Sequence, residues 1–540
     1  MRAAAHLAVA AAALALPAAA QDIETLSHLS GRPLPAGYYE RIRTDPGFFE
    51  HTLLWPGASV LSETEPADPP GRRVVRGKPR MVVMMGLFAD SPQPPVSAAT
   101  VHERLFGANP AGNLTDFYRE MSGGRLTIEG AVLPWVRTRF TRAQAAGTSF
   151  GLGTDSQMGW YLRDILDRVD GGTDMGRFDN DGPDGVPNSG DDDGVVDLAV
   201  FQFAEPAASC DTDAIWPHRA SISGWLGAAY TTDDLTPSGH AVVVNQYHIQ
   251  SAVDCSGQPQ TISTIAHETG HAFGLPDLYD ATGGIFPSQR RWVLGCWTLM
   301  AAGAWGCGDG SAWISAPTPA HMSPQEKIWV GWLTPIVAQP GWRRAYNLRP
   351  VQTSADALLV PLRTGPEYLL LEYRTNTGYD ASLPAGGVLV YHVEQGRPLR
   401  ISCNACDRKY LVSLVEADGD AALLRTAQEG GNRGVAGDVF GGRRMIDDNS
   451  TPSLRLNSGL PANVEVQIEV ADGIARSVVS TLPVVASPRL LAPLLGTSGA
   501  PPVDDEQAAL DRFGNRNGRY DMGDLRAYMR SRPRTVTQGS

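Results

Sequence analysis

Runs of apolar and polar positions divide the chain into regions of different pattern. An unbroken apolar run over residues 80–88, bounded by Pro and Asp, predicts a buried strand. The helical pattern of residues 115–121 leads through a Ser-Gly-Gly turn into another strand, and residues 324–333 predict a helix that closes this region. The first region therefore mixes helices and strands.

The pattern changes near residue 335. Short apolar runs separated by Gly, Pro and Asp follow at residues 357–362, 368–373, 387–393, 410–415 and 464–470. Several short strands between turn residues are typical of all-β domains. We therefore expect an α+β fold, with a mixed domain over residues 78–335 and an all-β accessory domain over residues 336–485.

The N-terminus has the pattern of a secretory signal. Arg2 precedes an apolar run over residues 3–16, and alanines at 18–20 stand before Gln21. Residues 1–20 are predicted to be a signal peptide, which makes the protein secreted and extracellular. No later run is long and apolar enough to cross a membrane, so no membrane span is expected.

Residues 21–77 are predicted to be a pro-segment. They are rich in proline and charge and end in a basic patch at 72–76, an exposed junction of the kind that proteases cut. A plain N-terminal extension is the alternative. The segment contains no cysteine, so a thiolate that blocks a metal is excluded as a mechanism of latency.

Six cysteines agree with an oxidising compartment. Fifteen pairings of six cysteines exist, and our hypothesis is Cys210 with Cys255, Cys296 with Cys307, and Cys403 with Cys406. The last two, spaced C-x-x-C, are alternatively half of a metal site or a redox pair. No second C-x-x-C exists, which favours a local disulfide.

Residues 267–277 read H-E-x-x-H-x-x-G-x-x-D. On a helix His267 and His271 lie on one face a turn apart, so both imidazoles can bind one metal ion, and Glu268 is placed to take a proton from an activated water. The helix must end after His271 because Gly274 and Pro276 follow, so Asp277 can turn back as the third ligand. Three protein ligands are typical of catalytic zinc.

Two other interpretations of this motif remain. Asp280 becomes the third ligand if the turn is one residue longer. Alternatively, the segment is an ordinary amphipathic helix whose histidines have no metal.

This motif, followed by Leu-Tyr-Asp, resembles the secreted immune-inhibitor-A-type zinc metallopeptidases, relatives of the metzincins. The resemblance implies a metzincin-like peptidase domain with a mixed sheet and an active-site helix. Residues 295–305 are similar to the methionine turn of that family, which makes Met300 the hydrophobic floor below the ligating imidazoles. Protein or peptide substrates follow from the same resemblance.

Acidic residues are dense between positions 174 and 197, interleaved with Asn and Gly. Carboxylates this close repel one another unless a divalent cation lies among them, and oxygen ligands in flexible turns suit calcium. A solvated acidic loop is the alternative. The predicted calcium ligands are Asp179, Asp181, Asp184, Asp191, Asp193 and Asp197.

The C-terminus predicts a Pro/Gly/Ser-rich linker over 486–503 and a tail over 504–540 that resembles one dockerin repeat. With Gly518 as the turn glycine, Phe513 falls at the first position of a calcium loop, where it cannot ligate, and Asp511 is its substitute. Such a repeat suggests a cell-surface partner. The expected calcium ligands are Asn515, Asn517, Asp521 and Asp524.

The net charge of −13 argues against nucleic-acid binding and leaves many carboxylates for calcium. The predicted function is that of a secreted zinc endopeptidase with Glu268 as general base, in which Tyr279 or His218 stabilises the oxyanion. His392 is expected to be an ordinary strand residue. A zinc hydrolase of a non-peptide bond and a secreted adhesin with an inactive peptidase domain are the alternatives.

Overall fold

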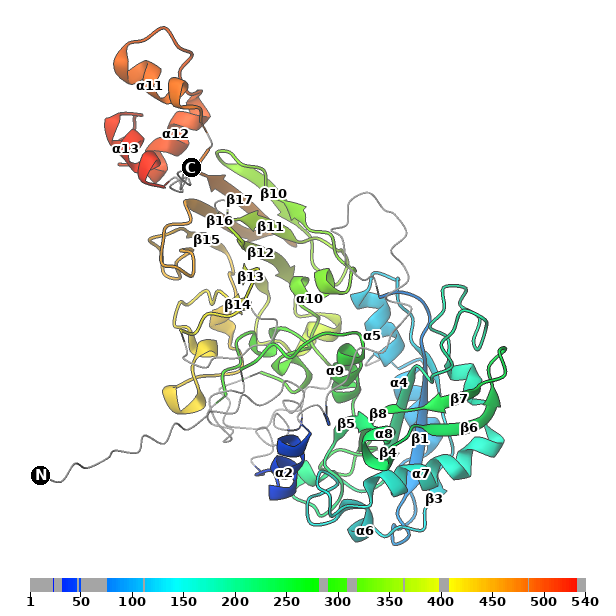
Figure 1. Ribbon diagram of the computed structural model, residues 1–540. Coiled ribbons are helices and arrows are strands. Elements are labelled where there is room, and N and C mark those ends of the chain that lie inside the picture. Colours follow the sequence, from blue (N-terminus) through cyan, green and yellow to red (C-terminus); the bar gives the residue numbers. More distant parts are fainter. Residues whose placement is uncertain are drawn as a thin grey trace, which may run out of the picture.

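The computed structural model describes residues 23, 32–45, 48–49, 75–109, 112–280, 290–307, 318–362, 365–397, 407–483 and 485–531. The predicted signal peptide, most of the basic patch at 72–76, and the Cys403 and Cys406 pair lie outside these residues. Figure 1 shows a mixed α/β body, two sheets above it and a small group of helices at the far end. Among the described helices, none combines the length and the apolar character that crossing a membrane requires.

The body is built on a mixed sheet with the strand order β2-β1-β4-β8-β5, and β3 also pairs with β1. β1, β2, β3, β4 and β8 run parallel, and β5 pairs antiparallel with β8 at the edge. From Met81 to Leu87 every residue of β1 is buried, which confirms the strand expected from the apolar run. The strands are β1 (Arg80–Leu87), β2 (Glu129–Val132), β3 (Val136–Arg137), β4 (Leu198–Phe203), β5 (His218–Ser221) and β8 (Gln246–Ser251).

Helices surround this sheet, and β6 (Tyr230–Leu235) and β7 (Ala241–Val244) form a separate hairpin (Figure 1). One helix, α7, comes very close to β1: a Cβ added to Gly86 would lie 2.3 Å from Ile165 Cδ1. A larger residue at that position would therefore require the side chains of Ile165 and Tyr161 to shift. The helices are α4 (Ala98–Leu105), α5 (Leu114–Met121), α6 (Arg142–Ala146), α7 (Met158–Val169), α8 (Ile222–Leu226), α9 (Ser263–Ala272) and α10 (Pro324–Trp329).

Two further sheets follow in the chain. Their strands pair antiparallel except β9 with β11. The five-stranded sheet has the order β14 (Val412–Leu414), β13 (Gly387–Glu394), β12 (Glu367–Arg374), β11 (Leu358–Pro361), β9 (Ile336–Val337). The four-stranded sheet has the order β10 (Arg344–Leu348), β17 (Ile474–Thr481), β16 (Val464–Ala471), β15 (Arg443–Ile446).

The five-stranded sheet is covered on both faces. In β12, Leu370 belongs to the core of the mixed body, whereas Leu369 and Leu371 belong to a second core with the four-stranded sheet. Alternate residues therefore serve two different cores, because successive side chains of a strand point to opposite faces. This explains why these antiparallel strands read as continuous apolar runs rather than as alternating ones.

The C-terminal residues form three helices, α11 (Ser487–Leu495), α12 (Asp504–Phe513) and α13 (Met522–Ser531). α11 occupies part of the stretch that the sequence predicts as a linker. Its Leu490 is buried with Val485, Leu510 and Tyr528. This small core stabilises the helix even though the segment is rich in proline and glycine. Arg512 of α12 pairs with Glu465 and, at 3.2 Å, with Asp447, which joins the helices to the four-stranded sheet.

Part of the predicted pro-segment packs on the mixed body. Helix α2 (Ala36–Thr44) buries Tyr38 and Ile42, and Figure 1 shows it against the lower part of the molecule. The Arg41 guanidinium lies 4.2 Å from the ring centroid of Trp225. Phe49 packs edge-on against His218, with ring centroids 5.7 Å apart.

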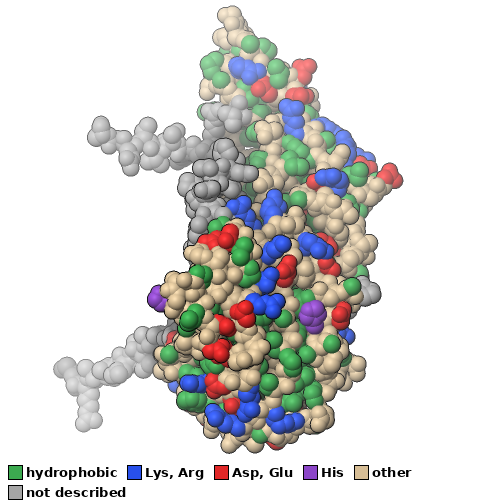
Figure 2. All heavy atoms as spheres, turned by 90° about the vertical axis from the view of Figure 1, so that its right-hand side faces the viewer, with side chains coloured by type: hydrophobic (Ala, Val, Ile, Leu, Met, Phe, Trp, Pro, Cys, Tyr) green, Lys and Arg blue, Asp and Glu red, His purple; other side chains and the backbone are tan. Residues whose placement is uncertain are grey.

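Two disulfides lie within the described residues. They join Cys210 to Cys255 and Cys296 to Cys307, which confirms two of the three proposed pairings. On the face shown in Figure 2, acidic and basic side chains are intermingled, so the net negative charge does not gather there in one patch.

Candidate functional site

Three side chains meet at the C-terminal half of α9. His267 Nε2 lies 3.1 Å from His271 Nε2, and Asp277 Oδ1 lies 3.2 Å and 3.4 Å from these two nitrogens. Ligand atoms about 2.0–2.1 Å from a tetrahedral zinc ion must be about 3.3–3.4 Å apart. The observed triangle therefore has the size that zinc requires.

Hydrogen bonds to backbone carbonyls fix both imidazoles. His267 Nδ1 lies 2.9 Å from the carbonyl oxygen of Leu299, and His271 Nδ1 lies 2.7 Å from that of Leu275. A carbonyl can only accept, so each Nδ1 carries the proton and each Nε2 presents a lone pair. Asp277 Oδ1, also buried, makes no hydrogen bond within the described part of the chain. Three electron-pair donors that face one another fit a cation among them.

The turn after α9 brings Asp277 back to the histidines. Gly274 adopts φ of 85°, the left-handed conformation expected at this helix end. Leu275 N donates to the carbonyl of Gly270 at 3.2 Å, which closes the turn. Leu278 N then donates to the carbonyl of Met300 at 2.7 Å, so the segment with Asp277 is tied directly to the predicted methionine turn.

Met300 is fully buried against α9. A Cβ added to Gly270, which lies between the two histidines in sequence, would be 2.6 Å from Met300 Sδ. This contact places the thioether directly below the helix, where the sequence predicts the hydrophobic floor. Trp305 packs against the imidazole ring of His267, and the two ring centroids are 4.5 Å apart.

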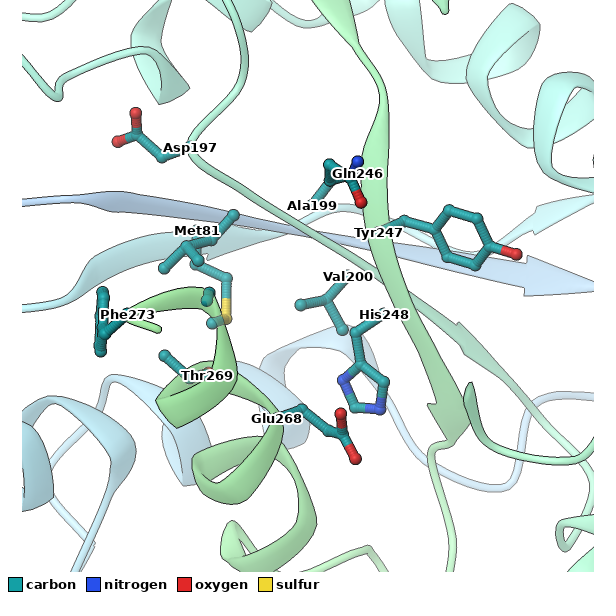
Figure 3. Close-up of a pocket in the computed structure, with 12 residues that line it drawn as sticks. Met81, Asp197, Ala199, Val200, Gln246, Tyr247, His248, Glu268, Thr269 and Phe273 are labelled. Carbon is teal, nitrogen blue, oxygen red and sulfur yellow. The ribbon is translucent and has the colours of Figure 1, made fainter. Parts of the chain in front are cut away.

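Glu268 is buried beside the histidines and lines a cavity of about 40 Å³ between α9 and the sheet. Figure 3 shows the Glu268 carboxylate and the imidazole of His248, on β8, pointing toward each other. The lining is mostly apolar, with Glu268 and His248 among its polar groups, and a cavity of this volume has room for a water molecule bound to them. The arrangement therefore offers a carboxylate, an imidazole and space for water at one place.

Several residues near this site were not predicted from the sequence. His248 and Trp305 are two of them, and Glu326 of α10 is a third. Buried Glu326 accepts a hydrogen bond from Met300 N at 3.2 Å and another from the Thr298 hydroxyl. It therefore holds the backbone around Met300. A weak signal for Glu326 is present in the sequence, because Ser323 and Glu326 have the spacing of a capping box, which the structure forms.

A larger hollow of about 520 Å³ lies next to Trp305. Its lining includes Ser263 and Thr264 from the first turn of α9, together with Pro217 and Gln250. Most of the exposed lining is apolar. Because Trp305 lines this hollow and also contacts His267, the hollow lies next to the cluster of His267, His271 and Asp277.

The other residues singled out in the sequence lie elsewhere. His218 is buried, with Nδ1 2.7 Å from the carbonyl of Trp216 and Nε2 3.0 Å from the Tyr247 hydroxyl; burial lowers the pKa of His218 to about 4. Asp280 lies outside the cluster of His267, His271 and Asp277 and accepts a hydrogen bond from the Tyr410 hydroxyl at 2.8 Å. His392 of β13 contacts Glu367 at 2.7 Å within the five-stranded sheet.

Tyr279, the other side chain suggested for the oxyanion, is fully buried. Its ring packs against Trp292, with centroids 5.6 Å apart, and the Arg290 guanidinium lies 5.5 Å from its centroid. These contacts are those of a packed core residue.

The acidic loop brings together three of its predicted ligands. Oxygens of Asp179, Asp181 and Asp197 lie within 4.8 Å of one another. Burial, with the charges of Asp192 and Asp193 next in effect, raises the pKa of Asp179 to about 7. The remaining three lie outside this cluster and serve the loop backbone: Asp184 accepts from Val186 N, Asp191 from Asp184 N, and Asp193 from Val195 N.

The C-terminal loop is held by the side chains predicted there. Asp511 accepts hydrogen bonds from Asn517 N at 2.8 Å and from Gly518 N at 3.1 Å. Its carboxylate therefore lies at the loop, where the Phe513 side chain offers no ligand atom. Asp524 Oδ1 accepts from Asn515 N at 2.8 Å. Asp521 accepts from the amide groups of Asn515 and Asn517.

Comparison with known proteins gives a match over part of the chain. Residues 104–332 match the catalytic-domain model of the immune inhibitor A peptidase M6 family. Immune inhibitor A of Bacillus thuringiensis subsp. alesti is 30% identical over 227 residues, which cover 39% of this chain and 30% of that protein. Pre-pro-metalloprotease PrtV of Vibrio cholerae serotype O1 (strain M66-2) is 28% identical over 207 residues, 36% of this chain and 21% of that protein. The matched segment spans less than a third of either relative.

Proposed function

We propose, from the premise that residues 104–332 carry a catalytic domain of the immune inhibitor A peptidase M6 family, that this protein is a secreted zinc-dependent endopeptidase. The observation that carries the proposal is the triangle formed by His267, His271 and Asp277. Its edges of 3.1–3.4 Å match a zinc ion with three protein ligands and a fourth position left for chemistry.

The residues around the triangle have distinct roles in this proposal. Zinc, when bound, supplies the Lewis acidity that activates a water and polarises the scissile carbonyl. Leu299 and Leu275 orient the imidazoles through their carbonyl groups, which also keeps Nε2 available as the ligand atom. Met300 and Trp305 pack around the ligands and exclude water from below.

Glu268 is the proposed general base. It takes the proton of the attacking water and delivers it to the leaving amine. Its burial beside a cavity with room for water supports this role. His248 faces Glu268 from β8 and is positioned to orient that carboxylate (Figure 3).

The hollow beside Trp305 is the proposed binding place for a substrate side chain. Its apolar lining favours a large hydrophobic residue next to the scissile bond. This rests on the zinc site, because Trp305 joins the two.

The decisive experiment compares casein cleavage by the purified protein with that by Glu268→Gln, with zinc measured in both. Removal of the base should lower kcat by about 100- to 10 000-fold. Zinc content should stay equal, because Glu268 is not one of the three ligands. Glu103→Gln, on the exposed side of α4, is the matched control and should keep full activity.

Other results would redirect the proposal. Loss of zinc in Glu268→Gln would make Glu268 part of the metal site. Inactivity of the wild-type protein on casein despite bound zinc would favour the hydrolase of a non-peptide bond.

Calcium is proposed at two places that use oxygen ligands. The close carboxylates of buried Asp179, buried Asp181 and half-buried Asp197 support the first. The arrangement of Asp511 and Asp524 around one loop supports the second. Asp181→Asn and Asp524→Asn should each reduce the rise in melting temperature that calcium produces in the wild-type protein.

Latency through the pro-segment is the last part of the proposal. The burial of Tyr38 and Ile42 on the body supports a segment that folds together with the peptidase. If cleavage activates the protein, the N-terminus of active protein should lie between Val74 and Pro79, because a later cut would sever the buried strand β1. An active protein that still begins at Gln21 would exclude activation by cleavage.

A further inference from the structure

A loop of the β-sheet region supports the methionine turn from outside. It connects β14 to β15, and its backbone meets the segment just before Met300. Val293 N donates to the carbonyl of Leu423 at 2.9 Å, and Cys296 N donates to that of Arg433 at 2.6 Å. A Cβ added to Gly434 would lie 2.7 Å from Cys296 Sγ, so the two segments are in close contact.

This loop contains a cluster of carboxylates outside the sites proposed above, and its Glu416 carboxylate also accepts hydrogen bonds from Ala422 N at 2.8 Å and Leu423 N at 3.2 Å. Oxygens of Glu416, Asp418 and Asp420 lie within 4.8 Å of one another. Two oxygens on opposite sides of a calcium ion are about 4.6–5.2 Å apart, since each lies about 2.3–2.6 Å from the ion. The three carboxylates therefore fit within one calcium coordination sphere.

A fourth acidic residue, Asp438, lies on the segment that packs against the cluster, although its oxygens are not among those within 4.8 Å of one another. Its neighbour Gly437 is so close that an added Cβ would be 2.3 Å from Asp418 Oδ2, and Ala417 N donates to the Asp438 carbonyl at 3.0 Å. Burial raises the pKa of Asp438 to about 6, and the charges of Asp418 and Asp420 add to the rise.

The two oxygens of Asp438 differ in their partners. Oδ2 accepts from Trp297 Nε1 at 2.7 Å and from Val435 N at 3.0 Å. Oδ1 is buried and makes no hydrogen bond to any described residue, and Asp438 as a whole is fully buried. An unsatisfied buried carboxylate oxygen is costly, and a nearby cation would satisfy it.

We propose that Glu416, Asp418, Asp420 and Asp438 form a calcium site that braces the methionine turn. The ligands are hard oxygens on a loop, as calcium prefers. Arg425 lies 3.3 Å from Asp420, and a single guanidinium balances only one of the four negative charges. The ion holds Asp438 in place, Asp438 holds Trp297, and Trp297 stands three residues before Met300. Calcium at this site therefore stiffens the floor of the zinc centre without touching it.

Carboxyl footprinting of the intact wild-type protein tests the site at single residues. The protein is labelled with a carbodiimide and an amine, in calcium and after exchange into calcium-free buffer, with zinc kept saturating in both. The labelled residues are mapped by mass spectrometry. At calcium ten times above the dissociation constant, labelling of Asp418 and Asp420 should fall about tenfold, because only the free site reacts. Glu469, exposed on β16, is the internal control and should not change.

A pair of variants provides the second measurement. Asp418 and Asp420 are exposed, so Asp418→Asn with Asp420→Asn removes charge at the surface and leaves the buried Asp438 intact. The calcium-dependent rise in melting temperature should be smaller in this variant than in the wild type and unchanged in Glu469→Gln. Footprinting distinguishes this site from the Asp179 cluster and the C-terminal loop.

Equal labelling of Asp418 and Asp420 with and without calcium would overturn the proposal. This result does not depend on whether the variant folds.

Discussion

The contact between Gly270 and Met300 makes a prediction whose sign can be tested. In Gly270→Ala the new Cβ would stand 2.6 Å from Met300 Sδ and 3.4 Å from Met300 Cε. Both atoms belong to a fully buried side chain that packs below α9. Met300 must therefore move, and the floor of the proposed zinc site moves with it.

The expected magnitude follows from two opposing effects. Alanine in place of glycine inside a helix stabilises by about 1 kcal/mol. Overpacking of a filled core costs about 1–3 kcal/mol. Gly270→Ala should thus destabilise the wild-type protein by about 0–2 kcal/mol.

Met300→Ala provides the matched background. Alone it should cost about 2–5 kcal/mol, because it leaves a cavity. With the thioether gone, the nearest remaining atom to the new Cβ is the Tyr118 hydroxyl oxygen at 3.5 Å, an ordinary contact. In that background Gly270→Ala should stabilise by about 1 kcal/mol, so the two substitutions couple by about 1–3 kcal/mol.

Urea unfolding of the four proteins, followed by tryptophan fluorescence, measures the cycle. Zinc affinity is measured beside it and should weaken in Gly270→Ala but not further in the double variant. Additive free energies of unfolding would refute the contact between Met300 and the helix. A stabilising Gly270→Ala in the wild-type background would refute the overpacking argument itself.

Three further predictions test the surroundings of the site. Tyr410→Phe removes the hydroxyl that donates to buried Asp280, so chemical denaturation should show a loss of about 1–3 kcal/mol, and no loss would mean that Asp280 has another donor. Burial lowers the pKa of His218 from 6.5 to about 4, so its contribution to the free energy of unfolding is complete above pH 6.5 and is lost as the pH falls toward 4. This contribution is about 3 kcal/mol. In His218→Gln the free energy of unfolding should therefore change less with pH between 6.5 and 4. Replacing Cys296 and Cys307 by serine removes a disulfide with a sequence separation of 11, which should lower the free energy of unfolding by about 3 kcal/mol. An unchanged melting temperature would show that the segment around Met300 is rigid without the disulfide.

The sequence predicted those parts of the site that depend on short-range geometry. The helical spacing of His267 and His271 and the turn at Gly274 are local, and each follows from the residues themselves. The buried strand β1 and the apolar runs of β12 and β13 were found for the same reason, since burial on both faces leaves a continuous signal.

Contacts between distant segments could not be predicted in this way. Trp305 against His267, His248 opposite Glu268, and Glu326 below Met300 arise only when the chain is folded. Short polar strands were not predicted either, because exposed elements such as β15 show little apolar periodicity. Helix α11 was not predicted because the sequence around it is rich in proline and glycine.

The shared core of the five-stranded sheet bears on how the protein unfolds. Leu370 and Leu389 fill the same core as Met81 and Val82 of β1, on one face of β12 and β13. A cut at residue 335, where the chain pattern changes, would therefore expose the underside of the mixed body. The two regions should melt as one cooperative unit. A cleavage site placed in a connecting loop should yield fragments that remain associated until the whole unit unfolds.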